Sequence, residues 1–161
     1  MRRLSQYSFI ITFVWLGFVL AISFLEAPVK FSTPTLTLPV GLDVGRHVFY
    51  ALNKAELVFL VLTILFIFFG RIQFAVIIFC FLLAVILILQ TFWLLPQLSA
   101  RVDIYLRGDI PADSNVHIIY ILMEAVKVFL IFLLGWFQIK NFTKNYFLNI
   151  SRDKSFIPGN P

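Results

Sequence analysis

Four side chains that could do chemistry interrupt an apolar stretch of the chain, the residues 116–130: they are His117, Tyr120, Glu124 and Lys127. Their spacings of three, four and three place them on one face of an α-helix. At ~1.5 Å per residue, Glu124 and Lys127 would lie roughly 11–17 Å along the helix from Val116, which is mid-membrane depth if the helix crosses a bilayer. A charge at that depth costs about 2.5–3.5 kcal/mol on insertion scales and usually marks a functional site. This polar stripe is therefore the centre of the candidate site.

Other polar side chains in the chain could meet the stripe from neighbouring helices. The candidates are Glu26, Lys30, Arg46, Asn53, Lys54 and Glu56, with Gln90 and Gln97 on a further helix. Such groups turn inward in lipid and pair with one another or line a wet cavity. Glu124 and Lys127 can neutralise each other as an i,i+3 pair. Lys54 is two residues from Glu56 and faces elsewhere, so we expect Glu56 to meet Lys127 or Arg46.

Together these residues predict a polar pocket in one half of a helical bundle. Glu56 and Glu124 would be its acidic members, and Lys54, Lys127 and Arg46 would be the counter-charges. His117 and Tyr120 would form hydrogen bonds or transfer protons. We expect Glu124 and Lys127 at the floor of this pocket, an opening toward the extracytosolic side, and a dry opposite half with almost no polar residues. Buried ion pairs that only fix helix register are the alternative interpretation.

Cofactor chemistry finds less support in the sequence. His47 and His117 could be axial haem ligands, and His117 with Glu56 and Glu124 could hold a divalent metal. No HExxH or paired-histidine spacing supports a metal site, so neither a metal nor another cofactor is predicted. The single Cys80 lies in an apolar run, which excludes an intrachain disulfide and favours a buried small side chain over a reactive thiol.

Composition assigns the chain to the membrane proteins. Of its 161 residues, 61% are hydrophobic and only 13% are charged, against about 25% charged in soluble domains. Such a chain cannot cover its surface with polar groups, and its length suits one domain. The net charge of +5 is scattered along the chain, so a nucleic-acid partner is not expected. The expected partners are the lipid bilayer, a small-molecule or lipid ligand, and a second copy or another membrane protein.

The predicted architecture is an all-α bundle of four transmembrane helices, at about 7–25, 48–69, 74–95 and 116–138. Three prolines predict a loop at 26–40, and Asp43 is a reasonable N-cap for a helical pattern over 44–69. Residues 70–73 predict a tight turn. We expect a kink at Pro96, with helix continuing to Leu106 and ending at Gly108. Asp113 or Ser114 would cap the last helix, and residues 139–161 would follow the 1–138 transmembrane domain as a cytoplasmic tail.

The basic residues set the predicted orientation. Four spans place both termini on one side, which carries Arg2, Arg3, Arg71, Lys140, Lys144, Arg152 and Lys154 against Asp153 alone. The positive-inside rule makes that side cytoplasmic. A signal peptide is the competing interpretation of residues 7–25, although this apolar run is longer than the usual signal core. We therefore expect a multi-pass protein with cytoplasmic N and C termini.

Two segments resemble a known group of proteins. Residues 24–31 read FLEAPVKF, and Gly41, Gly45, Arg46, Val48, Phe49, Asn53 and Glu56 follow with the pattern GxxxGRxVFxxxNxxE. This arrangement resembles small bacterial four-span membrane proteins of uncharacterised function, over about a third of the chain. The resemblance implies a bacterial inner (cytoplasmic) membrane protein and adds weight to Glu26, Lys30, Arg46, Asn53 and Glu56. It implies no activity.

Three functions fit these observations. The first is a small inner-membrane protein that binds a polar or amphipathic ligand, or relays protons, in its extracytosolic half. The second is a membrane-embedded enzyme of redox or lipid-modifying type that uses the same residues. The third is a structural or assembly subunit whose polar stripe faces a partner helix. The sequence leaves open whether the protein is an enzyme.

Overall fold

The first span is one continuous helical segment, in a computed structural model that describes residues 7–68 and 74–154. It consists of α1 (Ser8–Val19), the π-helical segment η2 (Leu20–Glu26) and α2 (Ala27–Phe31). The predicted loop from residue 26 is therefore wrong for 26–31. Pro28 lies at the start of α2, directly after η2. Proline has no N–H to donate. The π-helical turn before it already departs from the i→i−4 hydrogen-bond pattern, so the helix continues past Pro28.

The second span, α3 (Leu38–Phe68), begins earlier than the sequence suggested. Its first turn contains Pro39, which is tolerated there because the first N–H groups of a helix have no intrahelical partner. The predicted N-cap at Asp43 is thus wrong, and the connection to α2 shrinks to residues 32–37. At ~1.5 Å per residue the 31 residues of α3 extend over about 46 Å.

The third span repeats the design of the first. It consists of α4 (Phe74–Leu89), the π-helical segment η3 (Gln90–Leu94) and α5 (Leu95–Leu106). Pro96 again lies just after the π-helical segment. The predicted end of the helix is confirmed: Leu106 is its last residue, and Gly108 adopts φ 90°, a conformation that glycine allows without strain. The predicted turn at 70–73 lies outside the described residues.

The fourth span, α6 (Val116–Lys154), is the longest helix. The Ser114 hydroxyl oxygen accepts a hydrogen bond from the Val116 N–H at 3.2 Å, which confirms one of the two predicted caps. Residue 138 was the predicted end of the membrane span; the helix itself continues past it without a break through 139–154. Residues 155–161 of the predicted tail lie outside the described residues.

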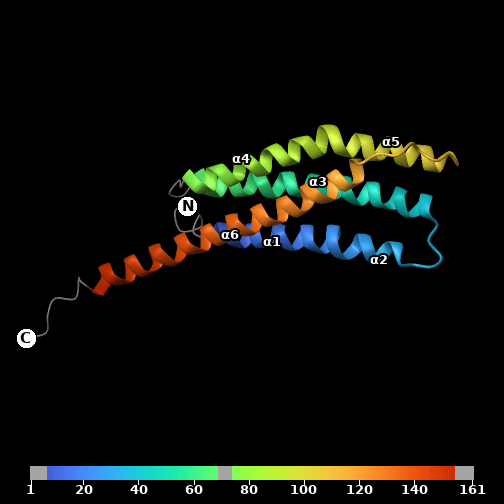
Figure 1. The fold of residues 1–161 in the computed structure, drawn as a ribbon. Coiled ribbons are helices and arrows are strands. Elements are labelled where there is room, and N and C mark those ends of the chain that lie inside the picture. The colour runs from blue at the N-terminus through green and yellow to red at the C-terminus, as the bar shows by residue number, and fades with distance from the viewer. Residues whose placement is uncertain (1–6, 69–73, 155–161) are drawn as a thin grey trace, which may run out of the picture.

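The four spans run alternately up and down, so that α1 begins and α6 ends at the same end of the bundle (Figure 1). We call this the terminal end, and the end with residues 32–37 and 107–115 the loop end. α6 packs along α1 and α4, and its first turns contact η3 and α5; α3 packs against α1 and α5. The apolar core is buried mainly among α1, α4 and α6, with Trp15, Leu83, Leu87, Ile131 and Leu134 at its centre.

The described residues contain four helical segments long and apolar enough to cross a membrane: Ser8–Phe31, Leu38–Phe66, Phe74–Leu106 and Val116–Lys144. Their outward faces carry many exposed large apolar side chains, such as Phe74, Phe81, Phe92 and Phe129. In water such faces would aggregate, whereas acyl chains solvate them. The architecture is thus the all-α four-helix bundle predicted from the sequence.

Candidate functional site

A closed ionic cluster lies at the centre of the bundle. The Lys127 ammonium donates to Glu124 Oε1 at 2.6 Å, to Glu56 Oε2 at 2.7 Å and to Gln90 Oε1 at 2.9 Å. The Lys127 side chain is 0% exposed, and those of Glu56 and Glu124 are 1% and 2% exposed. Both predicted contacts, Glu124 with Lys127 along α6 and Glu56 with Lys127 across helices, are confirmed. We call Glu56, Gln90, Glu124 and Lys127 the central cluster.

Neutral donors complete the hydrogen bonding of the two carboxylates. The Trp15 indole N–H donates to Glu56 Oε1 at 3.1 Å. The Gln90 amide donates to Glu124 Oε1 at 2.9 Å, and the Ser23 hydroxyl donates to Glu124 Oε2 at the same distance. Ser23 belongs to η2 and Gln90 to η3, so each π-helical segment supplies one hydrogen-bond donor to Glu124. π-Helical turns inside longer helices are often found at functional sites.

Sequence reasoning missed two of these hydrogen-bond donors, Trp15 and Ser23. Trp15 is completely buried and donates to Glu56. Ser23 donates to Glu124 from the first span. Neither residue stands out in an apolar segment, because an indole counts as hydrophobic and a lone serine shows no periodicity. The signal that existed was in Glu26 and Lys30: their i,i+4 spacing indicates that helix continues past Ser23 into α2.

An apolar pocket adjoins the central cluster on its loop-end side. Its volume is about 560 Å³, within the usual range for small-molecule sites. Most of its lining is apolar and comes from η2, α2, α3, α5 and α6: Phe24, Ala27, Pro28, Phe31, Leu38, Leu42, Gly45, Phe49, Leu98, Val102 and Ile121. The polar lining residues are Ser23, Arg46, Arg101, Tyr105, His117, Tyr120 and Glu124. A polar pocket was expected here, whereas the walls of this one are mostly apolar, and of the predicted site residues Arg46, His117, Tyr120 and Glu124 line it.

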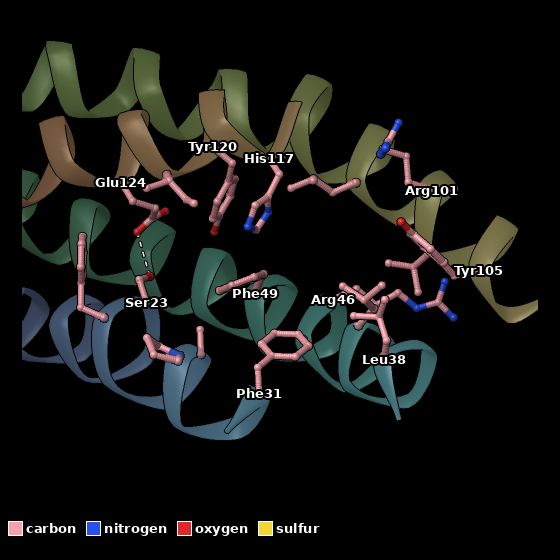
Figure 2. Close-up of a pocket in the computed structure, with 18 residues that line it drawn as sticks. Ser23, Phe31, Leu38, Arg46, Phe49, Arg101, Tyr105, His117, Tyr120 and Glu124 are labelled. Atoms are coloured by element: carbon pink, nitrogen blue, oxygen red, sulfur yellow. Dashed lines mark hydrogen bonds between the residues drawn. The ribbon is translucent and has the colours of Figure 1, made fainter. Parts of the chain in front are cut away.

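The polar groups of the pocket are separated along its length. Figure 2 shows Glu124 and Ser23 together at one end, with the arginines and Tyr105 toward the other. Tyr120 and His117 lie between them on α6. Glu124 is the member of the central cluster shared with the pocket, whereas Lys127 is enclosed behind it. The predicted floor is therefore correct for Glu124 and wrong for Lys127.

The two arginines of the pocket are held by groups near the loop end. Arg46 Nε lies 2.7 Å from Asp43 Oδ1, and Arg46 Nη1 also pairs with Asp103 of α5. Arg101 Nη1 donates to the carbonyl oxygen of Ala112 at 2.7 Å. Arg46 is thus a lining residue but not a counter-charge of Glu56, because Asp43 and Asp103 lie closer to it.

The remaining predicted site residues do not join the cluster. Lys54 is exposed, because two residues along a helix from Glu56 is about 200° of rotation. Glu26 and Lys30 pair with each other at 3.1 Å beside the pocket, without lining it. Asn53 is buried on the next turn of α3 from Glu56 and accepts a hydrogen bond from Thr91 at 2.9 Å. The prediction that Lys54 serves as a counter-charge is wrong.

The terminal half of the bundle is less dry than expected. Its buried polar residues are Ser8, Thr12, Thr63 and Gln138. The Thr12 hydroxyl donates to Gln138 Oε1 at 2.7 Å, linking α1 to α6. Thr63 Oγ1 and Gln138 Nε2 are buried without a hydrogen-bond partner in the part of the chain described. These two atoms are therefore exceptions to the rule that buried polar groups in proteins are hydrogen-bonded.

The two histidines considered as haem ligands lie in different environments. His117 lines the pocket, but the His47 side chain is 72% exposed, with Nδ1 2.8 Å from the carbonyl oxygen of Asp43. The two rings thus have different surroundings. Among residues 7–68 and 74–154, no group of three or more His, Cys, Asp or Glu residues could hold a metal ion. In the central cluster the Lys127 ammonium lies between the carboxylates of Glu56 and Glu124 and supplies the positive charge there.

The arrangement can bind an amphipathic molecule and can hold a proton within a hydrogen-bonded network. Both properties come from the geometry of this chain.

Comparison with protein-family models, with curated proteins and with solved structures finds no match to this chain.

Proposed function

We propose that this chain is a multi-pass protein of the bacterial inner membrane that binds a small amphipathic ligand in its extracytosolic half. The basic residues near the terminal end support cytoplasmic termini through the positive-inside rule. The loop end then faces the extracytosolic side, and the pocket opens in that half.

The observation that carries the proposal is the pocket itself. It combines about 560 Å³ of mostly apolar space with a small set of polar groups from η2, α3, α5 and α6 that are distributed along its length. This combination is the usual form of a small-molecule site, in which apolar walls supply affinity and a few polar groups fix orientation. Glu124 and Ser23 would orient one end of the ligand.

Four large apolar lining residues have exposed side chains: Phe24, Phe31, Leu38 and Ile121. Phe24 of η2 and Ile121 of α6 are 44% and 47% exposed and both line the pocket. An opening flanked by such side chains at membrane depth admits molecules from the bilayer, which is the solvent of an amphipathic ligand.

Native purification in a mild detergent followed by mass spectrometry tests the proposal. We expect the protein to retain a small molecule, and Ala27→Trp to abolish this retention because the indole fills the pocket. Ala51→Trp is the matched control, since Ala51 is exposed on α3 and does not line the pocket. Retention of the same molecule by a folded Ala27→Trp variant would contradict the proposal.

A second candidate function, proton relay, is favoured by a different observation. Buried polar side chains continue from the central cluster into the terminal half, at Thr63, Thr12 and Gln138. With water at the unpartnered atoms, they would connect the cluster to the cytoplasmic side. Reconstituted vesicles that contain a pH-sensitive dye test this function under a potassium diffusion potential. Proton flux equal to that of empty vesicles would eliminate it.

A further inference from the structure

The central cluster has an unbalanced charge. It contains two carboxylates, Glu56 and Glu124, and one ammonium, Lys127, all at least 98% buried. The other side chains hydrogen-bonded to these groups, Trp15, Ser23 and Gln90, are neutral. When all three ionisable groups are charged, the cluster carries a net charge of −1. An uncompensated charge in the interior costs several kcal/mol, so the cluster favours one additional positive charge.

Other charged groups around the pocket do not supply it. Arg46 is shared between Asp43 and Asp103, and Lys30 is paired with Glu26. Arg101 and Tyr105 of α5 lie toward the opposite end of the pocket from Glu124 (Figure 2). His117 and Tyr120 lie between them on α6, and α1 contributes only the Trp15 indole to the cluster. The missing charge must therefore be a proton or a cation that occupies the pocket.

The lining of the pocket suits an organic cation. Five aromatic rings line it: Phe24, Phe31, Phe49, Tyr105 and Tyr120. The faces of such rings attract ammonium and related cations, most strongly where water is excluded. Glu124 and Ser23 reach the same space from its deep end. Aromatic walls with a carboxylate behind them recognise a hydrophobic cation better than a neutral molecule of the same shape.

We propose that the ligand of this pocket is a hydrophobic organic cation, and that it and a proton compete for the negative charge shared by Glu124 and Glu56. In the empty state one proton neutralises the cluster, on one of the two carboxylates. When the cation enters, its charge takes over this role and the proton leaves to solvent. One positive charge replaces another, so the net charge of the site is unchanged. This inference rests on the proposed ligand-binding function.

A series of probes with one shape and different charges tests the first half of the inference. Tetraphenylphosphonium, tetraphenylborate and neutral triphenylphosphine oxide would be titrated into the purified protein in neutral detergent, with empty micelles subtracted. We expect the cation to bind at least about tenfold tighter than the neutral probe, which corresponds to 1.4 kcal/mol, and the anion to bind most weakly. Equal or tighter binding of the neutral probe or the anion would overturn the inference while leaving ligand binding intact.

Proton release tests the second half. In weakly buffered solution with a pH indicator, binding of tetraphenylphosphonium should release up to one proton per protein. Because proton and cation compete, affinity for the cation should rise with pH by up to tenfold per unit and then level off once the empty cluster holds no proton. Affinity that is independent of pH, without proton release, would overturn the exchange.

Two substitutions that balance the cluster provide the decisive control. Glu124→Gln and Glu56→Gln each leave one carboxylate with Lys127, so the pair is neutral without a proton. Both variants should bind the cation at least about tenfold more weakly, without proton release, and keep affinity for the neutral probe. Asp109→Asn, an exposed carboxylate outside the pocket, should behave as wild type. If the folded wild-type protein binds none of the probes, the proposed function itself is contradicted. If it binds the probes without preferring the cation, only this inference is contradicted.

Discussion

At the scale of single residues, Lys127 organises the site. Its three N–H donors are matched by three acceptors from three helical segments: Glu56 of α3, Gln90 of η3 and Glu124 of its own helix. An ammonium group can only donate hydrogen bonds, and all three of its N–H groups have an acceptor here. The position therefore tolerates neither a shorter side chain nor a neutral one.

Replacement of Lys127 by methionine should destabilise the protein by about 3–5 kcal/mol, because it leaves two buried carboxylates without their counter-charge. Thermal unfolding of the purified variant in detergent measures the effect. Lys54→Met is the matched control: Lys54 is exposed on the same bundle, and its substitution should change stability little. Equal unfolding temperatures for Lys127→Met and Lys54→Met would contradict the role assigned to the cluster.

A pair of threonines tests the interpretation of the buried polar atoms in the terminal half. Thr12→Val removes the donor to Gln138 and should cost about 1–3 kcal/mol, since the amide stays buried with fewer partners. Thr63→Val replaces a hydroxyl that has no partner in the described residues by a group of the same shape, so stability should be unchanged or slightly higher. The unfolding temperatures of the two variants check the sign of each change. A larger loss for Thr63→Val than for Thr12→Val would be inconsistent with this assignment.

At the scale of elements, the two π-helical segments explain how the site is assembled. η2 and η3 each end two residues before a proline, and each supplies a hydrogen-bond donor to Glu124. The prolines predicted a loop after residue 25, but the wider π-helical turn lets the helix continue past Pro28, which has no N–H to donate. Helix boundaries depend on such local competition, which hydrophobic periodicity does not reveal.

What the sequence did reveal was which side chains share a helix face. The spacing of Glu124 and Lys127, and the placement of Glu56 away from Lys54, follow from 3.6 residues per turn. The Glu124–Lys127 pair was therefore predictable, and the partner of Glu56 was narrowed to Lys127 or Arg46. The position of Arg46 was not, because its choice of Asp103 over Glu56 depends on how α5 lies against α3. Trp15 was missed for a similar reason, since its role depends on the approach of α1 to α3.

Close packing between α1 and α6 yields a prediction at this scale. A Cβ atom added at Gly135 would lie 2.8 Å from the Phe13 ring, whereas one added at Gly17 would meet nothing within 4 Å. Gly135→Ala should therefore destabilise the protein by about 1–3 kcal/mol through overpacking. Gly17→Ala should be neutral or stabilise it by about 0.5–1 kcal/mol, because alanine favours helix. Unfolding temperatures of the two variants decide, and a stabilising Gly135→Ala would show that the helices do not meet as described.

At the scale of the whole molecule, the spans are longer than a bilayer requires. About 20 residues cross a hydrocarbon core of ~30 Å, yet α3 has 31 residues and the third span has 33. The surplus lies partly at the loop end, where Arg46, Arg101 and Asp103 are found. In the proposed membrane orientation, the pocket would extend from membrane depth, at Glu124, toward the interface. One bound molecule would then contact both acyl chains and the aqueous side.

Orientation in the membrane is the last prediction, and single cysteines can test it. The native Cys80 is buried, so Cys80→Ala provides a cysteine-free background. Ile110→Cys, at an 87% exposed position of the loop end, should react with a membrane-impermeant maleimide in spheroplasts. Lys144→Cys, exposed near the terminal end, should react only after the membrane is permeabilised. The reverse pattern would place the pocket in the cytoplasmic half and make its ligand and its protons cytoplasmic. The basic residues of the terminal end argue against that outcome, because moving them across the bilayer opposes the positive-inside rule.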